Sequence, residues 1–572
     1  MDIVYRLFYE EESILEKKLW RYLSVTLAVL LMMGVLSACA TSPQTTGSSN
    51  KNKSKGSNQA ADKAGSKTIH IMGPETGNPH IHFKDREKYS SWKEFQKLFK
   101  EKGLNPKFEV VANDQYQTTL QTRMASATDM PDFLNVTGLG DDTILNFVDK
   151  GTILPVNQII DEHSDGTAKQ FFAEGGKGAR SNALNAAENG NVYWISQIQA
   201  TTYDGKPGST NQVISVRKDW LDKLNLEVPK TADDFYHMLK AFREKDANGN
   251  GQQDEVLAFN PAAWNNGIAQ WFGLVNEISC FVIEDGKAVS PWYQPGIKDY
   301  FKYLNKLAKE GLMDTSTIGG GDPLDQVIAE NKAGAIFDYC MQTWQEPGTG
   351  DPDAAYLPIG PLKATDAAEP ILAIEPPYLS YNRWAFTKEC KDLDVAGTLL
   401  DILCSDKYME LTQWGIEGET YEVKDGEKKL LPIALNASWE QAAKEGKEIG
   451  DLIWANGSIF PKRRFVPMEN EISIVPEYKA EFQRNIIDYH PTTPLGKENY
   501  FPVPTQEQVQ RRLELNTDLG TQSSQLATQL ILGQISMDDW DSHIQSLKDL
   551  GLDEILKIDQ TLLDRYKKNV KD

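Results

Sequence analysis

The ten residues from 246 to 255, DANGNGQQDE, carry oxygen-rich side chains at the spacing of a calcium-binding loop. Asp246, Asn248 and Asn250 stand at positions 1, 3 and 5, and Gly251 stands at position 6, where such a loop turns sharply. Calcium takes six to eight oxygen ligands at about 2.3–2.6 Å, so carboxylates and amides at these positions suit it. The spacing therefore indicates a calcium site; the alternative is an asparagine- and glycine-rich turn without metal.

The second half of this loop departs from the usual pattern. Leu257 stands at position 12, where calcium loops usually carry a bidentate glutamate. Asp254 and Glu255 offer carboxylates instead, and Gln252 at position 7 offers its backbone carbonyl. A helix is expected before the loop and an apolar strand after it, so a bound Ca²⁺ would fix a helix–strand junction. We expect this calcium to be structural, without a catalytic role.

The N-terminal segment has the composition of a bacterial export signal. Lys17, Lys18 and Arg21 precede an apolar stretch of about 14 residues, which is short for a stable membrane span. The stretch ends in Leu-Ser-Ala-Cys39, which resembles the lipobox of bacterial lipoproteins. We expect residues 1–38 to be a signal peptide and Cys39 to be acylated, for example with palmitate; an uncleaved anchor is the alternative.

Two stretches that flank this signal have no place in a folded core. Residues 1–16 contain five acidic side chains ahead of Lys17 and Lys18, which suggests a start site placed too far upstream or an authentic extension. Residues 40–67 consist largely of Ser, Thr, Gly, Asn, Lys, Gln and Ala. Such a composition cannot bury enough apolar surface to fold, so residues 39–67 are expected to be a flexible tether behind the lipid.

The remaining chain is long enough for two lobes or several domains, because 572 residues exceed what one hydrophobic core supports. The formal net charge of −22 disfavours nucleic acid as a partner, since such a surface repels phosphate. Beyond Cys39 the cysteines are few, and none forms a CxxC pair; an even number in an exported chain allows disulfides, and buried free thiols are the alternative. They are Cys280, Cys340, Cys390 and Cys404.

The first part of the exported chain alternates strand-like and helix-like patterns. Strands are predicted at 67–72, 106–111 and 132–136, with helices at 91–103 and 116–127 between them. This β-α-β-α-β order predicts an α/β lobe with a largely parallel sheet. Further strands are expected at 192–198 and 213–216. Helical patterns then dominate, at 219–224, 231–245, 296–310, 391–413, 475–488, 504–533 and 537–570.

Around the calcium loop the sequence resembles a known family. Residues 213–231, VISVRKDWLDKLNLEVPKT, lead into the helix and the loop in the manner of the family 1 extracellular solute-binding lipoproteins of ABC importers. The similarity is strongest to their long branch, which occurs in Gram-positive bacteria and in alginate-oligosaccharide-binding proteins. In that branch the pattern D-x-N-x-N-x-x-x-D-E holds calcium, which implies as ligands Asp246, Asn248, Asn250, Gln252 through its carbonyl, Asp254 and Glu255.

The resemblance spans about residues 68–570 and rests on several further stretches. These are MASATDMPD at 124–132, KGTILP at 150–155, YLNKLAKEGLMD at 303–314, KAGA at 332–335 and WGIEG at 414–418. It implies a two-lobed α/β fold like that of periplasmic binding proteins, with a hinge, a central cleft and a helix-rich C-terminal lobe. The expected N-lobe comprises about 68–185 plus 325–385, and the C-lobe about 186–324 plus 386–572.

An oligosaccharide cleft would need aromatic rings for the apolar faces of sugars and polar groups for their hydroxyls. The chain has 13 Trp residues, and several lie in loops or strand ends expected to face the cleft. The candidate ligand residues are Glu75, Tyr203, Trp264, Asn265, Trp271, Asp338, Trp344, Glu375, Tyr378 and Tyr381, with Tyr339, Trp384 and Trp414 nearby. Any one of these aromatics could instead be a packing residue, and Trp92, Trp220 and Trp540 are expected to be so.

The resemblance implies a monomeric binding protein on the outer face of a Gram-positive cell membrane that delivers a solute to an ABC permease. A neutral sugar is favoured over a polyanionic one, unless Arg217, Arg383, Arg463 or Arg464 line the cleft. A ligand-presenting sensor subunit for a membrane kinase, or a secreted glycoside hydrolase, is the alternative. No HExxH, GxSxG or Walker A pattern is present, and the resemblance leaves no room for a catalytic domain, so we do not expect an enzyme.

Overall fold

A computed structural model describes residues 67–75, 82–203, 206–207, 213–258, 267–274, 282–284, 286–316, 318, 324–338, 355–366, 369–373, 378–431, 460–461, 463–467, 477–485, 491–492 and 502–569. Residues from Gly65 to Asp572 form one compact unit, and the segment up to Ala64 lies outside the described residues. No helix of the described part is both long and apolar enough to cross a bilayer.

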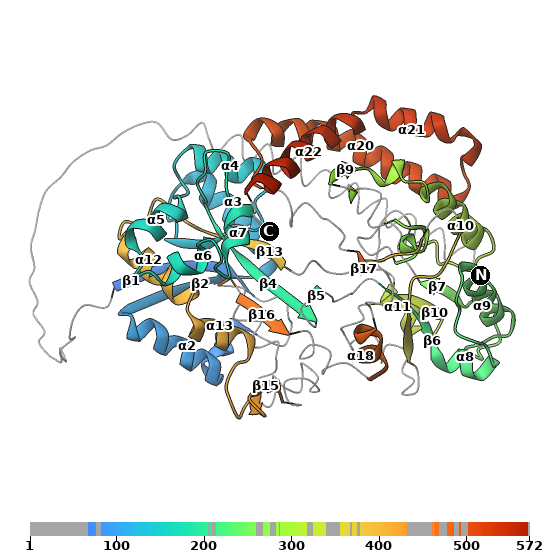
Figure 1. Ribbon diagram of the computed structural model, residues 1–572, viewed down its shortest axis with the longest axis horizontal. Helices are drawn as coiled ribbons and strands as arrows, with labels where there is room; N and C mark the ends of the chain where they lie inside the picture. The colour runs from blue at the N-terminus through green and yellow to red at the C-terminus, as the bar shows by residue number, and fades with distance from the viewer. Residues whose placement is uncertain are drawn as a thin grey trace, which may run out of the picture. The chain divides into compact units, whose positions relative to one another are not determined.

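The first sheet has the strand order β16-β4-β13-β3-β1-β2, and β5 pairs with the end of β4 (Figure 1). Strand β1 pairs in parallel with β2 and with β3, which confirms the β-α-β-α-β prediction. The strands are β1 (Lys67–Pro74), β2 (Leu104–Val111), β3 (Phe133–Asn135), β4 (Ile195–Tyr203), β5 (Lys206–Pro207), β13 (Tyr378–Phe386) and β16 (Arg463–Pro467).

Alternating residues of these strands enter two different hydrophobic cores, because successive side chains of a strand point to opposite faces. Ile71 and Phe133 belong to one core, whereas their neighbours Met72 and Leu134 belong to the other. Helices therefore cover both faces of the first sheet. Those of the first face are α2 (Ser90–Glu101), α5 (Val156–His163), α6 (Thr167–Phe172), α12 (Leu393–Leu403) and α13 (Asp406–Gln413); those of the second are α3 (Asn113–Ser126) and α4 (Asp141–Asp149).

A second sheet, of order β11-β6-β10-β7, has a separate core. Strand β6 pairs antiparallel with β10 and β11, and β10 pairs in parallel with β7. The strands are β6 (Val213–Arg217), β7 (Val256–Ala258), β10 (Ala333–Asp338) and β11 (Tyr356–Ile359). Nearby helices are α8 (Lys218–Leu224), α9 (Ala232–Glu244), α10 (Ile297–Lys309) and α11 (Leu324–Ala329). The two sheets and their separate cores fit the predicted two-lobed α/β fold.

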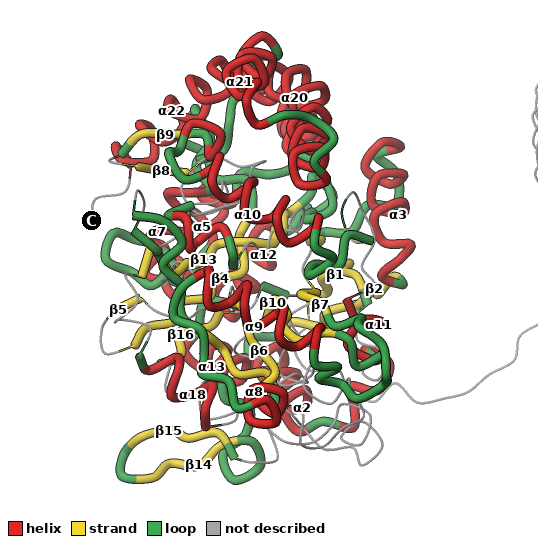
Figure 2. The backbone as a smooth tube through the Cα atoms, turned by 90° about the vertical axis from the view of Figure 1, so that its right-hand side faces the viewer, coloured by secondary structure: helices red, strands yellow, loops and turns green. Residues whose placement is uncertain are grey.

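Three C-terminal helical elements lie side by side (Figures 1 and 2). They are α20 (Gln506–Leu532), α21 (Trp540–Asp549) and α22 (Leu552–Asn569). Helix α20 has 27 residues, which corresponds to about 40 Å. Val509 near its start belongs to a core of the first sheet, whereas Leu519 and Leu530 belong to the core of the second. One helix therefore contributes to both lobes.

Smaller elements complete the described chain. They are α7 (Ala179–Leu184), α18 (Glu477–Arg484), the hairpins β8 (Val282–Glu284) with β9 (Lys287–Val289) and β14 (Tyr421–Lys424) with β15 (Glu427–Leu430), the pair β12 (Leu372–Ala373) with β17 (Pro491–Thr492), and the 3-10 turns η1 (Phe83–Lys88), η2 (Ala269–Phe272), η3 (Pro291–Tyr293) and η7 (Met537–Asp539).

The strand pairing corrects the lobe boundaries that we expected. Strand β4, assigned to the C-lobe, pairs with β13 in the first sheet. Strands β10 and β11, assigned to the N-lobe, pair with β6 in the second. Helices α12 and α13 also pack on the first sheet, although they follow residue 386. The chain thus crosses between the sheets at other points than predicted, because local patterns do not specify which strands become neighbours.

Two long predicted helices are divided, and in each case a residue type explains the break. The pattern at 391–413 forms α12 and α13, because the hydroxyl of Ser405 accepts a hydrogen bond from the backbone N–H of Tyr408 and caps the second helix. The pattern at 537–570 forms η7, α21 and α22, with Gly551 at φ +98° between the last two helices. The remaining predicted helices agree with the structure to within a few residues.

Two of the cysteines are buried free thiols. Cys390 and Cys404 both pack in the first core without a disulfide partner. Burial raises the pKa of each thiol to about 12. For this pair the buried-thiol alternative is confirmed, whereas Cys280 and Cys340 lie outside the described residues.

Two helical glycines should respond in opposite ways to replacement by alanine. Gly397 lies in α12, and a Cβ there would stand 2.1 Å from the backbone oxygen of His163. Gly397→Ala should therefore lower the free energy of unfolding by about 1–3 kcal/mol, as overpacking does. Gly520 lies in α20 with nothing within 4 Å of its Cβ position, so Gly520→Ala should raise stability by about 0.5–1 kcal/mol. Urea unfolding of both variants checks this, and a Gly397→Ala variant as stable as the native chain would contradict the packing.

Candidate functional site

The carboxyl-terminal edge of the first sheet is where the chain passes toward the second sheet. Strand β4 is antiparallel to β13, which is antiparallel to β3, so the carboxyl ends of β1, β3 and β4 share one edge with the amino end of β13. Strand β16 is parallel to β4 and ends there too. In open α/β sheets, ligands bind outside the carboxyl ends of the strands. This edge is therefore the place to look for predicted ligand residues.

Three predicted tyrosines lie on neighbouring strands close to this edge. Tyr203 is the last residue of β4, and Tyr378 is the first residue of β13. Tyr378 pairs with Ala200, and Tyr381 pairs with Gln197, in the register of the two strands. The fold thus brings together residues about 175 positions apart, as the prediction of a shared site requires. Their side chains lie outside what the structure describes.

Two predicted acidic residues occupy comparable positions on other strands. Glu75 follows β1 at the same edge, and its carboxylate accepts a hydrogen bond from the backbone N–H of Phe83 at 2.9 Å. Its backbone N–H donates to the oxygen of Val111 at 2.7 Å, so Glu75 also organises the turn after β1. Asp338 is the last residue of β10 in the second sheet and pairs with Val213, where β6 begins.

Two strands lie between the outermost of these positions. Strands β4, β13, β3 and β1 are adjacent in that order, with about 4.8 Å between neighbours, so Tyr203 and Glu75 stand roughly 14 Å apart across the sheet. This span suits a ligand longer than a single sugar ring. The predicted residues Trp264, Asn265, Tyr339, Trp344 and Glu375 fall outside the described residues.

Three predicted tryptophans are packing residues, which corrects the prediction. Trp271 is 2% exposed in the core of the second sheet, where its ring lies 4.9 Å from that of Phe235. Trp384 is fully buried in a core of the first sheet. Trp414 is buried against Tyr421 at 5.9 Å. Each stands beside a strand end or turn in sequence, but its strand or helix turns it inward. Trp92 and Trp220 are core residues as expected, and Trp540 is partly buried.

Three of the four arginines considered as sugar-acid ligands have structural roles. Arg217 is 1% exposed, and its guanidinium contacts Asp219 at 2.6 Å and lies over Trp220. Arg383 pairs with Asp141 at 2.6 Å. Arg463 is fully buried and donates to the backbone oxygen of Ser196. The side chain of Arg464 lies outside the described residues.

The loop from Asp246 to Glu255 joins α9 to β7, as predicted. Its side-chain oxygens accept hydrogen bonds from backbone N–H groups further along the loop: Gly251 donates to Asp246 at 2.9 Å, and Gln252 donates to Asn250 at 2.7 Å. Asn250 in turn donates through its backbone to Asn248 at 3.0 Å. These contacts wind the loop into a succession of tight turns.

Two carboxylate oxygens in this loop are buried without a hydrogen-bond partner. They are Oδ1 of Asp246 and Oε2 of Glu255, and Glu255 as a whole is 1% exposed. The other oxygen of Glu255 accepts the backbone N–H of Asn248 at 3.0 Å. A buried carboxylate oxygen without a partner is unfavourable, and a cation between the two residues would satisfy both. The donor set therefore fits a hard cation such as Ca²⁺.

The loop is also tied to the second sheet through Asn331, a residue that no sequence pattern singles out. The side chain of Asn248 donates to the backbone oxygen of Asn331 at 3.1 Å, and the side chain of Asn331 accepts from Arg217 at 2.6 Å. Asn331 lies 83 positions from Asn248 and has φ +56°. Only the fold brings these residues together, so no local signal could have identified it.

Within the described residues, no group of three or more His, Cys, Asp or Glu side chains is placed to hold a metal ion. A cation in the 246–255 loop would therefore depend on amide and backbone oxygens as well as on carboxylates. That mixture is typical of calcium and unlike the nitrogen and sulfur ligands of zinc.

A family model described as bacterial extracellular solute-binding protein matches residues 84–410, more than half of the chain. The chain belongs to this family. FusA, a fructooligosaccharide ABC transporter substrate-binding protein of Streptococcus pneumoniae, is 24% identical over 464 residues, which cover 78% of this chain and 82% of FusA. Lipoprotein LipO of Bacillus subtilis is 28% identical over 263 residues, covering 42% and 49% of the two chains.

Two solved structures show the same fold. The structure of an S. pneumoniae FusA EF-hand mutant in complex with fructo-nystose has a TM-score of 0.66 at 22% identity, and the match covers 88% of this chain and 100% of that one. Alginate-binding protein AlgQ2, solved without calcium ion, has a TM-score of 0.62 at 22% identity, with 88% and 99% covered. The two-lobed architecture predicted for this solute-binding protein is thereby confirmed.

Replacing Trp271 should separate packing from ligand binding. Trp271→Ala removes a fully buried ring, so the free energy of unfolding should fall by about 3–5 kcal/mol. The affinity of the protein that remains folded should not change. Chemical unfolding and a binding titration at low temperature measure the two effects. Native stability combined with lost binding would return Trp271 to the ligand site.

Proposed function

We propose that this chain is the lipid-anchored, oligosaccharide-binding component of an ABC importer. The single observation that carries the proposal is the family match over residues 84–410. The named activity of FusA, which aligns over 78% of the chain, favours an oligosaccharide as the solute. The ligand would bind at the carboxyl edge of the first sheet, between Glu75, Tyr203 and the start of β13, and facing Asp338.

In this proposal the protein acts as a monomer whose lobes close on the sugar. The connections between the two sheets, from β5 to β6 and from β11 to β13, would serve as the hinge, and differential affinity for the closed form would drive closure. The closed form would then dock on the permease. The aromatic rings would cover the apolar faces of the sugar, and the carboxylates would accept hydrogen bonds from its hydroxyls.

Thermal unfolding against a panel of neutral oligosaccharides tests the proposed ligand class. A sugar at a hundredfold excess over its Kd should stabilise the protein by about 2.7 kcal/mol by mass action. Chromatography of the same samples should show no shortened sugar. Failure of every sugar in the panel would contradict the ligand class, and appearance of cleavage products would favour a hydrolase.

Tyr378→Ala should weaken binding of the responding sugar at least tenfold, because a stacked aromatic ring commonly dominates such a site. Tyr293→Ala is the matched control, since Tyr293 is a half-buried tyrosine that contacts Asp553 on the α22 side of the second lobe. Isothermal titration measures both variants. Equal affinities for the two would place the sugar away from the amino end of β13.

We infer further that the 246–255 loop holds a structural Ca²⁺ between Asp246 and Glu255, with Asn248, Asn250, Asp254 and the carbonyl of Gln252 completing the oxygen set. The two buried carboxylate oxygens without partners support this assignment. The existence of an EF-hand mutant of FusA and of an AlgQ2 structure without calcium ion points in the same direction. When bound, the ion would neutralise the loop and fix the α9–β7 junction.

Calcium removal should lower the stability of the native chain. A site filled at a thousandfold excess over its Kd contributes about 4 kcal/mol, which a chelator would remove. With or without chelator, Glu255→Gln should unfold at the lower temperature that the native chain shows in chelator. Glu227→Gln, an exposed control, should respond to chelator as the native chain does. A native chain indifferent to chelator would mean that the loop is a turn without metal.

The lipid anchor rests on Cys39 in the sequence LSAC and on the naming of LipO as a lipoprotein. We expect the full chain, produced in a Gram-positive host, to fractionate with the membrane and to carry an acyl group on Cys39. Cys39→Ser should release the protein to the medium or leave it unprocessed. Mass spectrometry of the N-terminal peptide decides, and an unmodified Cys39 in the membrane fraction would contradict the assignment.

A further inference from the structure

A cavity of about 1230 Å³ lies beside the first lobe, apart from the edge proposed for the sugar. It is bordered by α5, α6 and α7, by the loops around them, and by the end of α22. None of the predicted ligand residues lines it, and its border includes Val192, just before the amino end of β4. The carboxyl end of that strand lies roughly 30 Å further along, at about 3.3 Å for each of nine residues.

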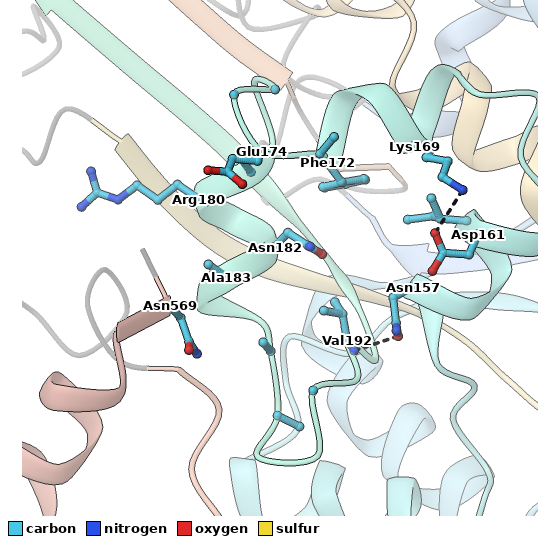
Figure 3. A pocket seen from close by; sticks show the side chains of 18 of the residues that line it. Asn157, Asp161, Lys169, Phe172, Glu174, Arg180, Asn182, Ala183, Val192 and Asn569 are labelled. Atoms are coloured by element: carbon cyan, nitrogen blue, oxygen red, sulfur yellow. Dashed lines mark hydrogen bonds and ion pairs between the residues drawn. The ribbon is translucent and has the colours of Figure 1, made fainter. Parts of the chain in front are cut away.

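Basic side chains outnumber acidic ones in this cavity, although the whole chain carries a net charge of −22. Of the three acidic residues, Asp161 is already paired with Lys169 at 3.6 Å. Figure 3 shows these two turned toward one another, whereas the side chain of Arg180 extends from α7 away from that pair. The cavity's basic residues are Lys169, Lys177, Arg180, Arg565 and Lys568, and its acidic residues are Asp161, Glu174 and Glu188.

Arg565, in the cavity wall, has a guanidinium N–H without a hydrogen-bond partner. One of its terminal nitrogens donates to the backbone oxygen of Val503, while its Nε is buried without a hydrogen-bond partner. Burial lowers the pKa of this guanidinium from its ordinary value, against a smaller opposing effect of Glu188. The carboxylate of Glu188 therefore does not compensate the Arg565 guanidinium for the water that it loses on burial. A ligand anion would supply the missing partner.

A second unbalanced positive charge lies behind the cavity wall. Arg463 is fully buried, and its Nε and Nη2 have no hydrogen-bond partner. Among the described residues, no carboxylate forms an ion pair with it. Its guanidinium lies 5.9 Å from the ring of Phe172, and Phe172 lines the cavity. Because arginine stays charged when buried, the Arg463 guanidinium adds positive electrostatic potential to the cavity through the wall at Phe172.

We propose that this cavity is a second binding site, which takes a small anionic ligand: carboxylate or phosphate groups on a body of up to three sugar rings. Arg565 and Lys568 on α22 and Arg180 on α7 would contact the anion, and the amides of Asn182 and Asn569 would contact the hydroxyls. The anion would link α22, which also packs in the second core, to the first lobe. The site is independent of the sugar at the sheet edge.

Trigalacturonate, its neutral methyl ester and inorganic phosphate are the probes, titrated into the mature protein by calorimetry. Trigalacturonate should bind and its methyl ester should bind at least tenfold more weakly, because the ester keeps the size and removes the charge. Binding should weaken further as salt is raised. If phosphate alone binds and competes, the site recognises phosphate groups; if only the carboxylate probe binds, it recognises sugar acids.

Three variants locate the binding. Arg565→Gln and Lys568→Gln should each weaken binding of the charged probe about tenfold, and Lys568 is exposed, so its replacement cannot unfold the chain. Lys557→Gln, an exposed lysine on the same helix outside the cavity, is the matched control and should bind as the native chain does.

Native affinity in both Arg565→Gln and Lys568→Gln would overturn the proposal, as would equal binding of the ester or the absence of binding by both charged probes. A neutral oligosaccharide titrated into the same variants should bind with native affinity. That result would distinguish this site from the proposed sugar site, because the loss of anion binding in the cavity leaves sugar binding at the sheet edge measurable.

Discussion

The pairing of β4 with β13 is the constraint on which the rest of this molecule depends. Both strands belong to the first sheet, and each leads by its outer end toward the second sheet. Their register brings Tyr203 and Tyr378 to one edge, beside the carboxyl ends of β1 and β3. Because the same residues end the strands and begin the crossings, any ligand held there also lies where the two lobes are joined.

Two further features hold the second lobe to this arrangement. Helix α20 contributes Val509 to a core of the first sheet and Leu519 to that of the second, so one rigid element shares in both cores. The 246–255 loop fixes the junction of α9 and β7, and Asn331 connects it to Arg217 at the end of β6. The geometry of the second sheet thus depends on part-buried polar contacts, and removing one partner leaves the other without its hydrogen bond.

Much of this fold could be predicted from the sequence, because several signals are local. The alternation of strand and helix patterns from 67 to 136 predicted a parallel sheet, and the helical pattern before the 246–255 loop with the apolar segment after it predicted a helix–strand junction. The lobe boundaries could not be predicted, since the partner of β4 lies about 180 residues later in the chain. Trp271 and Trp384 were misassigned for a related reason: a tryptophan near a strand end can face the core or the solvent, and only the neighbouring elements decide.

The most direct test of the proposed sugar site is hydrogen–deuterium exchange of the protein, in buffer that contains calcium, with and without the oligosaccharide that stabilises it. A sugar bound at the sheet edge should slow exchange in the peptides that cover the end of β4 and the start of β13, residues 199–207 and 372–381, with little change in α12. Protection that leaves those peptides unchanged and appears only around α7 and the end of α22 would contradict the claim that the sheet edge is the sugar site.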